Sequence, residues 1–359
     1  MRIALSFIAG ALLCAAQAGA ADFDPQDYRA QIHPVSPHVW LFKQPIGHEW
    51  HGNAALIEQS DGLVLIDTGG SAGDGRHIAS LIQSISDKPV KAVILTHWHD
   101  DHTLGLSAIK DAWPNVRIVA AEGALDGMEQ MMTKRTGLGA PDPALEAARA
   151  ERFTGYIDAY EADAADPSHT DDERRAAAEA AAVLRLRQKG YEGSYIVRPT
   201  ELVAETLSIH DPELPVEIPF LGRGNSQGDL VIRLPRQGIV FVGDLVVQPV
   251  PYGYSVFPKE WATTLRKLDA MEFTLLIPGH GEPVQDRLYL RLVLWSIEVI
   301  RKQVTALAVD GATLDEVNAK IDYSAHRAKW APHDPASWLD GITASVYNEA
   351  TGVPNLGGL

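Results

Sequence analysis

Residues 97–102, His-Trp-His-Asp-Asp-His, bring three imidazoles and two carboxylates together in one short stretch. Residues 90–95 before them are largely apolar and β-branched, which predicts a buried strand with the histidines on the loop that follows it. A loop fixed by a strand can direct the first two histidines to one point, and Asp101 and His102 to a neighbouring point, as a pair of metal ions requires. A polar turn that happens to be rich in histidine is the alternative, and this density of ligand-type residues argues against it. The stretch therefore predicts metal-dependent chemistry.

Two other predicted strands also end in a residue that can bind a metal. Residues 239–242 are apolar and lead into Gly243-Asp244, and residues 275–277 lead through Pro278 into Gly279-His280-Gly281. Glycine beside the ligand lets the backbone turn tightly around whatever the side chain holds. The chain therefore has three strand ends that could contribute to a single metal centre.

With these motifs the chain resembles the metallo-β-lactamase-fold superfamily. The resemblance depends on Leu-Ile-Asp-Thr-Gly at 65–69, His97-x-His99-x-Asp101-His102, Gly243-Asp244 and Gly279-His280, which occur in the family's order. It implies an α/β fold, a four-layer αββα sandwich with the site at the edge between the sheets. It further implies that Asp67 and Asp229 brace the ligand loops through hydrogen bonds.

The resemblance also implies a set of metal ligands. The first metal would be held by His97 and His99, the second by Asp101, His102 and His280, and Asp244 would bridge the two. Asp101 would in addition orient the metal-bound hydroxide that attacks the substrate. Imidazoles and carboxylates without a thiolate suit zinc, and iron or manganese would be tolerated. We therefore expect two zinc ions per chain.

One position departs from the family's pattern. Related proteins carry the third ligand of the first metal as a histidine in a Gly-x-His-Thr-x-Gly-Asp segment, whereas residues 222–229 here read Gly-Arg-Gly-Asn-Ser-Gln-Gly-Asp. Asn225 then takes the place of that histidine, and an amide oxygen would bind the first metal more weakly. The alternatives are that Asn225 holds a water, orients a substrate carbonyl or shapes the turn.

Residues 47–53, Gly-His-Glu-Trp-His-Gly-Asn, precede a predicted strand at the place where related enzymes carry a loop over the metals. His51 and Asn53 are therefore candidate substrate-binding residues, and His51 could approach the first metal. An ordinary polar hairpin is the alternative.

The elements that must position these residues form two sets. Predicted strands at 39–43, 54–58, 63–67, 92–97 and 116–120, with a helix at 73–85, make the first, and strands at 201–209, 216–221, 230–234, 239–242 and 274–277 make the second. Between them, a helical insertion at about 121–195 has helices at 144–164 and 171–188. C-terminal helices follow at about 284–359, beginning with an amphipathic helix at 288–309. We expect a single catalytic domain over residues 21–359.

The N-terminus predicts export. An apolar run at 3–16 follows Arg2, and Ala18-Gly19-Ala20 offers a small-residue cleavage site, so residues 1–20 have the pattern of a signal peptide. This predicts a secreted or periplasmic protein without stable membrane insertion, whose single cysteine, Cys14, leaves with the signal. A net charge of −16 argues against nucleic acid as a partner. No pattern indicates the oligomeric state.

The predicted activity is that of an exported zinc hydrolase whose partner is a small-molecule substrate, an ester, thioester, lactone or lactam. A true β-lactamase is one alternative, although zinc β-lactamases generally do without the bridging aspartate found here as Asp244. An iron enzyme similar to persulfide dioxygenases, and a metal-binding module without catalysis, are the others.

Overall fold

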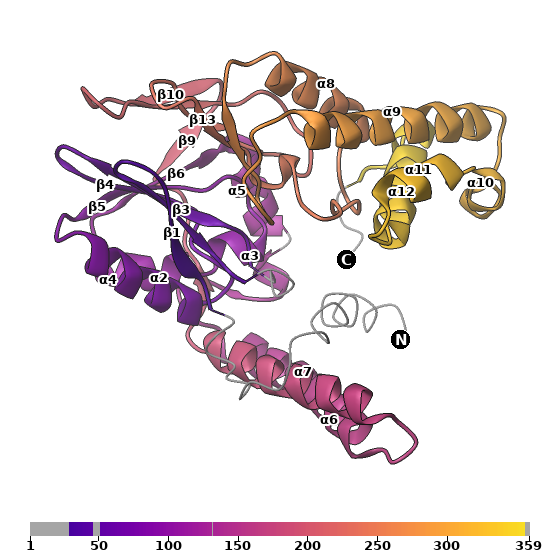
Figure 1. Cartoon of the computed structure of the whole chain (residues 1–359), viewed down its shortest axis with the longest axis horizontal. Helices are drawn as coiled ribbons and strands as arrows, with labels where there is room; N and C mark the ends of the chain where they lie inside the picture. The colour runs from indigo at the N-terminus through magenta and orange to yellow at the C-terminus, as the bar shows by residue number, and fades with distance from the viewer. Residues whose placement is uncertain (1–28, 46–50, 131, 356–359) are drawn as a thin grey trace.

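The computed structural model describes residues 29–45, 51–130 and 132–355. The predicted signal peptide lies outside them. Two β-sheets face each other, with helices on the outer side of each, so the layers follow the predicted order of helix, sheet, sheet and helix (Figure 1).

The larger sheet combines an antiparallel half with a parallel half. Strands β1 to β4 run antiparallel, and β4, β5, β6 and β9 run parallel. Its spatial order is β1 (Gln31–Ser36), β2 (Val39–Lys43), β3 (Ala54–Gln59), β4 (Gly62–Ile66), β5 (Val90–Ile94), β6 (Arg117–Ala121) and β9 (Glu201–Val203). The β5–β6 neighbourhood is buried on both faces, as the apolar runs there predict.

The second sheet is antiparallel except for its last pair, where β13 and β14 run parallel. Its order is β10 (Thr206–Ile209), β11 (Val216–Pro219), β12 (Ile232–Leu234), β13 (Ile239–Phe241) and β14 (Leu275–Ile277). In β13, Ile239 and Phe241 pack into the core between the sheets, while Val240 packs into the core beneath the outer helices. This alternation follows from the two-residue period of a strand and explains why the whole segment is apolar.

Helices cover both outer faces. On the larger sheet lie α2 (Ala72–Ile85) and α4 (Leu106–Ala112), and on the second sheet lie α8 (Pro258–Asp269) and α9 (Leu288–Val309) (Figure 1). The remaining short elements are α3 (Asp100–Thr103), α5 (Glu122–Gln130), η3 (Met132–Lys134), the paired strands β7 (Gly137–Leu138) and β8 (Tyr195–Ile196), and η4 (Gly243–Leu245). Three C-terminal helices follow α9, namely α10 (Leu314–Lys320), α11 (Ser324–Trp330) and α12 (Ala336–Thr351).

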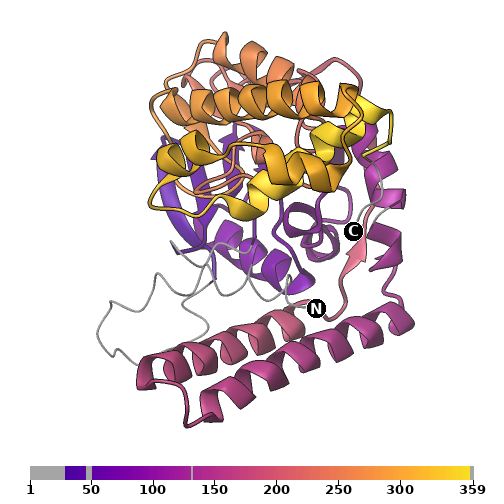
Figure 2. The same ribbon diagram turned by 90° about the vertical axis from the view of Figure 1, so that its right-hand side faces the viewer.

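The segment predicted as a helical insertion contains a long helical hairpin. Helices α6 (Pro143–Ala165) and α7 (Asp171–Gly190) pack side by side and extend away from the sheets (Figures 1 and 2). Asp142 caps α6 ahead of Pro143, and Thr170 forms a capping box with Glu173 at the start of α7. The hairpin joins the body near the start of α2, where the backbone N–H of Ala72 donates to Ser194 Oγ at 2.8 Å.

Within the described ranges, none of the helices combines the length and the apolar character that crossing a bilayer requires.

Candidate metal centre

The loop after β5 is fixed by one buried carboxylate on the neighbouring strand. Asp67 follows β4 with a positive φ of 53°, and it accepts hydrogen bonds from the backbone N–H of Thr96 at 2.8 Å and from Thr96 Oγ1 at 2.7 Å. Its Oδ2 also lies 2.9 Å from Nδ1 of His102. Asp67 therefore braces the ligand loop, as the resemblance implied, and leaves Nε2 of His102 as the ring nitrogen directed toward the site.

The first ligand cluster consists of His97, His99 and Asp244. Nε2 of His97 lies 3.0 Å from Nδ1 of His99 and 3.7 Å from Oδ2 of Asp244. The other nitrogen of His97, Nδ1, lies 3.0 Å from the hydroxyl of Thr96, which orients the fully buried ring. Both histidines come from the loop after β5, and Asp244 comes from the second sheet through β13.

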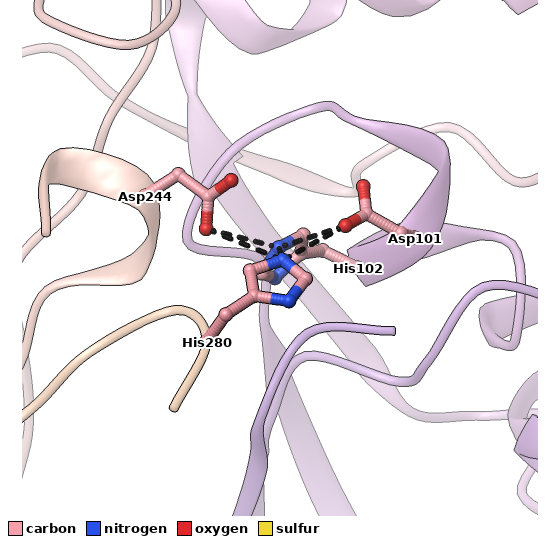
Figure 3. Close-up of side chains that lie close together, drawn as sticks. All are labelled: Asp101, His102, Asp244 and His280. Atoms are coloured by element: carbon pink, nitrogen blue, oxygen red, sulfur yellow. Dashed lines mark hydrogen bonds and ion pairs between the residues drawn. The ribbon is translucent and has the colours of Figure 1, made fainter. Parts of the chain in front are cut away.

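The second ligand cluster consists of Asp101, His102, Asp244 and His280. Figure 3 shows the two carboxylates on opposite sides of the paired imidazoles. Nε2 of His280 lies 2.9 Å from Oδ2 of Asp101 and 3.2 Å from Nε2 of His102, which in turn lies 3.2 Å from Oδ1 of Asp244. The structure thus brings together all six residues predicted as ligands in two clusters that share Asp244.

The donor atoms of these clusters fit metal ions better than they fit one another. In the described structure, Oδ1 of Asp244 is buried and accepts no hydrogen bond, although an imidazole nitrogen lies 3.2 Å away. The nitrogens of His102 and His280 face each other, and an imidazole nitrogen without a proton offers only a lone pair. Imidazole nitrogens and carboxylate oxygens that converge in this way are a donor set that a dication takes, so the two clusters are consistent with a binuclear metal site.

The electrostatics favour the protonation states that ligands need in the first cluster. Burial lowers the pKa of His97 well below its ordinary value and also lowers that of His99, so both are neutral imidazoles near pH 7. Burial opposes ionisation of Asp101 and Asp244, but the surrounding histidines outweigh it and lower the pKa of both carboxyls. His102 differs from His97 and His99. Burial lowers its pKa, but the nearby Asp101 and Asp244 outweigh burial, so the pKa of His102 is raised.

A glycine before His280 allows the bridging carboxylate to approach. A Cβ atom at Gly279 would overlap Oδ1 of Asp244. The backbone N–H of Gly279 also donates to the carbonyls of Gly243 at 2.8 Å and Val246 at 3.0 Å, which fastens the two ligand loops of the second sheet to each other. The glycines seen in the sequence beside both ligands therefore serve close packing.

Asn225 lies on the loop between β11 and β12, next to the loop that carries the histidines. Gln227 on the same loop accepts a hydrogen bond from Trp98 Nε1 at 2.7 Å, and the N–H of Leu230 donates to the carbonyl of Thr96 at 2.7 Å. The side chain of Asn225 is 1% exposed, and neither of its amide atoms has a hydrogen-bond partner among the residues that the structure describes. Coordination by Asn225 stays a prediction.

The two residues predicted to bind substrate are both buried. His51 is 7% exposed and places Nε2 3.0 Å from Oδ2 of Asp74, and its burial lowers the pKa of the imidazole to about 4. Asn53 donates both hydrogens of Nδ2 to backbone carbonyls, those of Pro278 and Gly281, each at 3.0 Å. This bonding leaves Nδ2 no hydrogen for a substrate.

The sequence motifs did not identify the aromatic side of the site. The ring of Tyr252 lies 6.2 Å from that of His99, and Tyr254 lies 5.7 Å beyond it. Burial raises the pKa of Tyr252 to about 12, so its hydroxyl stays protonated at neutral pH. The available signal was the Pro-Tyr-Gly-Tyr stretch at 251–254, close behind the predicted ligand Asp244.

Comparison with known proteins agrees with the geometry. The family model described as the metallo-beta-lactamase superfamily matches residues 48–280. The chain is 26% identical over 296 residues to the linear primary-alkylsulfatase of a Pseudomonas species, an alignment that covers 77% of this chain and 51% of that protein. The chain thus spans about half the length of this relative.

Solved structures show the same fold. The stereoselective inverting sec-alkylsulfatase Pisa1 from a Pseudomonas species is similar with a TM-score of 0.63 at 19% identity, over 91% of this chain and 51% of that one. A metallo-beta-lactamase from Pontibacter korlensis is similar with a TM-score of 0.51 at 18% identity, over 75% and 99%. At these identities the likeness concerns the fold alone.

Proposed function

Because the chain belongs to the metallo-beta-lactamase superfamily, we propose that it is a hydrolase dependent on two metal ions and that its substrate is a sulfate ester of an alkyl alcohol. The observation that carries the proposal is the pair of ligand clusters that share Asp244. The reaction adds water across the ester and releases the alcohol and hydrogen sulfate.

Two bound dications supply a water of lowered pKa and stabilise negative charge that develops on the substrate. The residues of the chain determine where the attacking water lies and how it is oriented. Asp101 is the most exposed member of the second ligand cluster, with 28% of its side chain accessible against 12% for His280 and 0% for His102. It therefore faces the open side of the site, where it can accept a hydrogen bond from the attacking water and orient it.

A sulfate ester is favoured over the carboxylic substrates by the relative that aligns over 296 residues, which is a linear primary-alkylsulfatase. The rings of Tyr252 and Tyr254 add an aromatic wall beside His99 that an alkyl chain could contact. Because the phenol of Tyr252 stays protonated, it adds no negative charge that would repel an anionic substrate.

The metal is proposed to be zinc, held by imidazoles and carboxylates without a thiolate. Asn225 is proposed to contribute its amide oxygen to the first metal, because this buried oxygen accepts no hydrogen bond from the residues that the structure describes and a cation would satisfy it. An amide is a weaker ligand than imidazole, so the first ion is expected to exchange faster than the second.

Export is a further part of the proposal and depends on the pattern of residues 1–20. Mass spectrometry of the mature protein from a bacterial periplasm would test it, with cleavage after Ala20 as the expected result. An intact N-terminus in the cytoplasmic fraction would contradict it.

A substrate panel tests the activity. Alkyl sulfates, carboxylic esters, thioesters, lactones and β-lactams are offered to the zinc-loaded protein, to the protein stripped by a chelator, and to His280→Ala. Turnover of alkyl sulfates that disappears in the last two samples is expected. Turnover of another substrate class without turnover of alkyl sulfates would contradict the proposed substrate. Bound iron with oxygen consumption would contradict hydrolysis.

A further inference from the structure

The second ligand cluster is assembled from both sheets. Asp101 and His102 follow β5 in the larger sheet, whereas Asp244 and His280 follow β13 and β14 in the second sheet. The distances within the cluster therefore depend on how the edges of the two sheets are held together at this point. A displacement of about 1 Å is enough to spoil such a site.

Residues Gly52 and Asn53, just before β3, lie across this junction. The backbone N–H of Gly52 donates to the carbonyl of Asp101 at 3.1 Å, and a Cβ atom at Gly52 would overlap the imidazole of His102. The segment thus packs flat against the ligands of the larger sheet. Only glycine fits between the backbone and that ring.

Asn53 makes the connection to the other sheet. Its backbone N–H donates to the carbonyl of Gly279 at 2.6 Å, and its Nδ2 donates to the carbonyls of Pro278 and Gly281, each at 3.0 Å. The three acceptors lie on both sides of His280. The side chain of Asn53 is 7% exposed, so these hydrogen bonds are shielded from water.

We infer that Asn53 is a positioning residue of the second ligand cluster, whose side chain fastens the loop bearing His280 to the sheet bearing Asp101 and His102. The inference rests on the two-metal site of the proposed function.

Asparagine is suited to this task by its length and by its two donor hydrogens. Both partners of Nδ2 are carbonyls, so the amide nitrogen must face them. An aspartate would place a carboxylate oxygen against the same carbonyls, and a serine could donate only one hydrogen. Asn53→Asp should therefore loosen the His280 loop without removing a ligand or changing the volume of the side chain.

The test is a zinc titration of the full chain in competition with a chromophoric chelator, with thermal unfolding of metal-free and zinc-loaded protein in parallel. Asn53→Asp is expected to lower the affinity for the second zinc ion by at least about tenfold, and to leave the affinity for the first within the error of the wild-type value. The rise in Tm that zinc produces should shrink in the variant. A merely structural role would lower the Tm of both forms equally and leave both affinities unchanged.

Asn355→Asp is the matched control. Asn355 is also buried and donates Nδ2 to a backbone carbonyl, that of Ser345 at 3.0 Å, and it lies in the C-terminal region. Asn355→Asp should lower the Tm of the metal-free and the zinc-loaded protein without changing either zinc affinity. If Asn53→Asp does not fold, Asn53→Ser, which keeps one donor, is expected to show a smaller loss in the same direction.

Two outcomes would overturn the inference. Wild-type affinity for both zinc ions in the Asn53 variants would remove the positioning role while leaving the two-metal site intact. A wild-type protein that binds no second zinc ion would contradict the two-metal site itself and the inference with it. The wild-type titration separates the two failures.

Discussion

Nδ1 of His102 lies 2.9 Å from Oδ2 of Asp67, a carboxylate that also holds the backbone and hydroxyl of Thr96. One side chain thus orients the ring of a candidate ligand and the loop on which the other candidate ligands of the larger sheet stand. Partners of this kind commonly matter to metal affinity nearly as much as the ligands do.

Replacing this brace should weaken metal binding while leaving every ligand in place. For Asp67→Ala we expect a loss of about 10- to 100-fold in zinc affinity, measured by chelator competition. Asp67→Asn, which keeps one acceptor oxygen, should lose less. Zinc affinities equal to the wild type in both variants would show that the contact does not orient His102.

Removing a ligand of the second cluster should abolish turnover. His102→Ala and His280→Ala are expected to lose the second zinc ion and to reduce kcat/KM for an alkyl sulfate by at least about 10³-fold. His326→Ala is the control, because His326 is as buried as His102 but lies in the C-terminal helices, where its Nε2 is 3.3 Å from the carbonyl of Ser296. Undiminished turnover in the two ligand variants would refute the assignment.

Asp211 should give the stability of the protein a pH dependence far from the metals. Burial opposes its ionisation, but hydrogen bonds from Ser60, Leu214 and Glu213 outweigh it and lower the pKa of the carboxyl. A carboxyl whose pKa falls on folding stabilises the fold above the unfolded value of about 3.9, and this contribution is lost as the pH drops through the folded pKa.

Asp211→Asn is therefore expected to lower the free energy of unfolding by about 1–3 kcal/mol at pH 7, and by less as the pH falls below about 4. Urea unfolding of the wild type and the variant between pH 3 and pH 7 measures the difference. A difference that is constant with pH would contradict the ionised, hydrogen-bonded state of Asp211.

A substitution at the base of the helical hairpin should weaken its packing against α2. A Cβ atom at Gly73 would lie 2.7 Å from Cα of Gly190, the last residue of α7, so Gly73→Ala must push the two backbones apart. We expect destabilisation by about 1–3 kcal/mol and faster hydrogen exchange where α7 meets α2.

Gly155→Ala provides the contrast within α6. A methyl group there would meet no described atom within 4 Å apart from the local backbone of its own helix, and alanine is the better helix former, so a gain of about 0.5–1 kcal/mol is expected. Equal exchange rates in Gly73→Ala and in the wild type would mean that the hairpin is not held at this contact.

Much of the fold follows from local patterns in the sequence. The amphipathic helix predicted at 288–309 matches α9, and the helices predicted at 144–164 and 171–188 match α6 and α7 within two residues at either end. Helices α6 and α7 are rich in alanine and begin at side-chain caps, so their structure depends little on distant contacts.

The strand predicted at 201–209 was wrong as a single element. A bend at Ala204–Glu205 separates β9, which pairs with β6 in the larger sheet, from β10, which pairs with β11 in the second. Periodicity does not tell which sheet a strand joins. Strand β1 was missed because its residues are largely exposed and include Pro34, which an edge strand tolerates.

The convergence of the candidate ligands could be predicted because each stands at the end of an apolar strand in a recognisable motif. The residue that ties the ligand loops of the two sheets to each other could not. Asn53 acts on residues more than two hundred positions away, and its partners are backbone carbonyls that leave no trace in residue type. The sequence showed only a polar residue before a strand, which is equally typical of a substrate contact.

Stepwise reconstitution of the metal-free protein tests the central claim most directly. Zinc is added in known equivalents while alkyl sulfate hydrolysis and bound zinc are measured in the same samples. We predict no turnover without metal, and turnover that rises with occupancy and reaches its plateau at two zinc ions per chain. Full turnover by protein from which all metal has been removed would contradict the account.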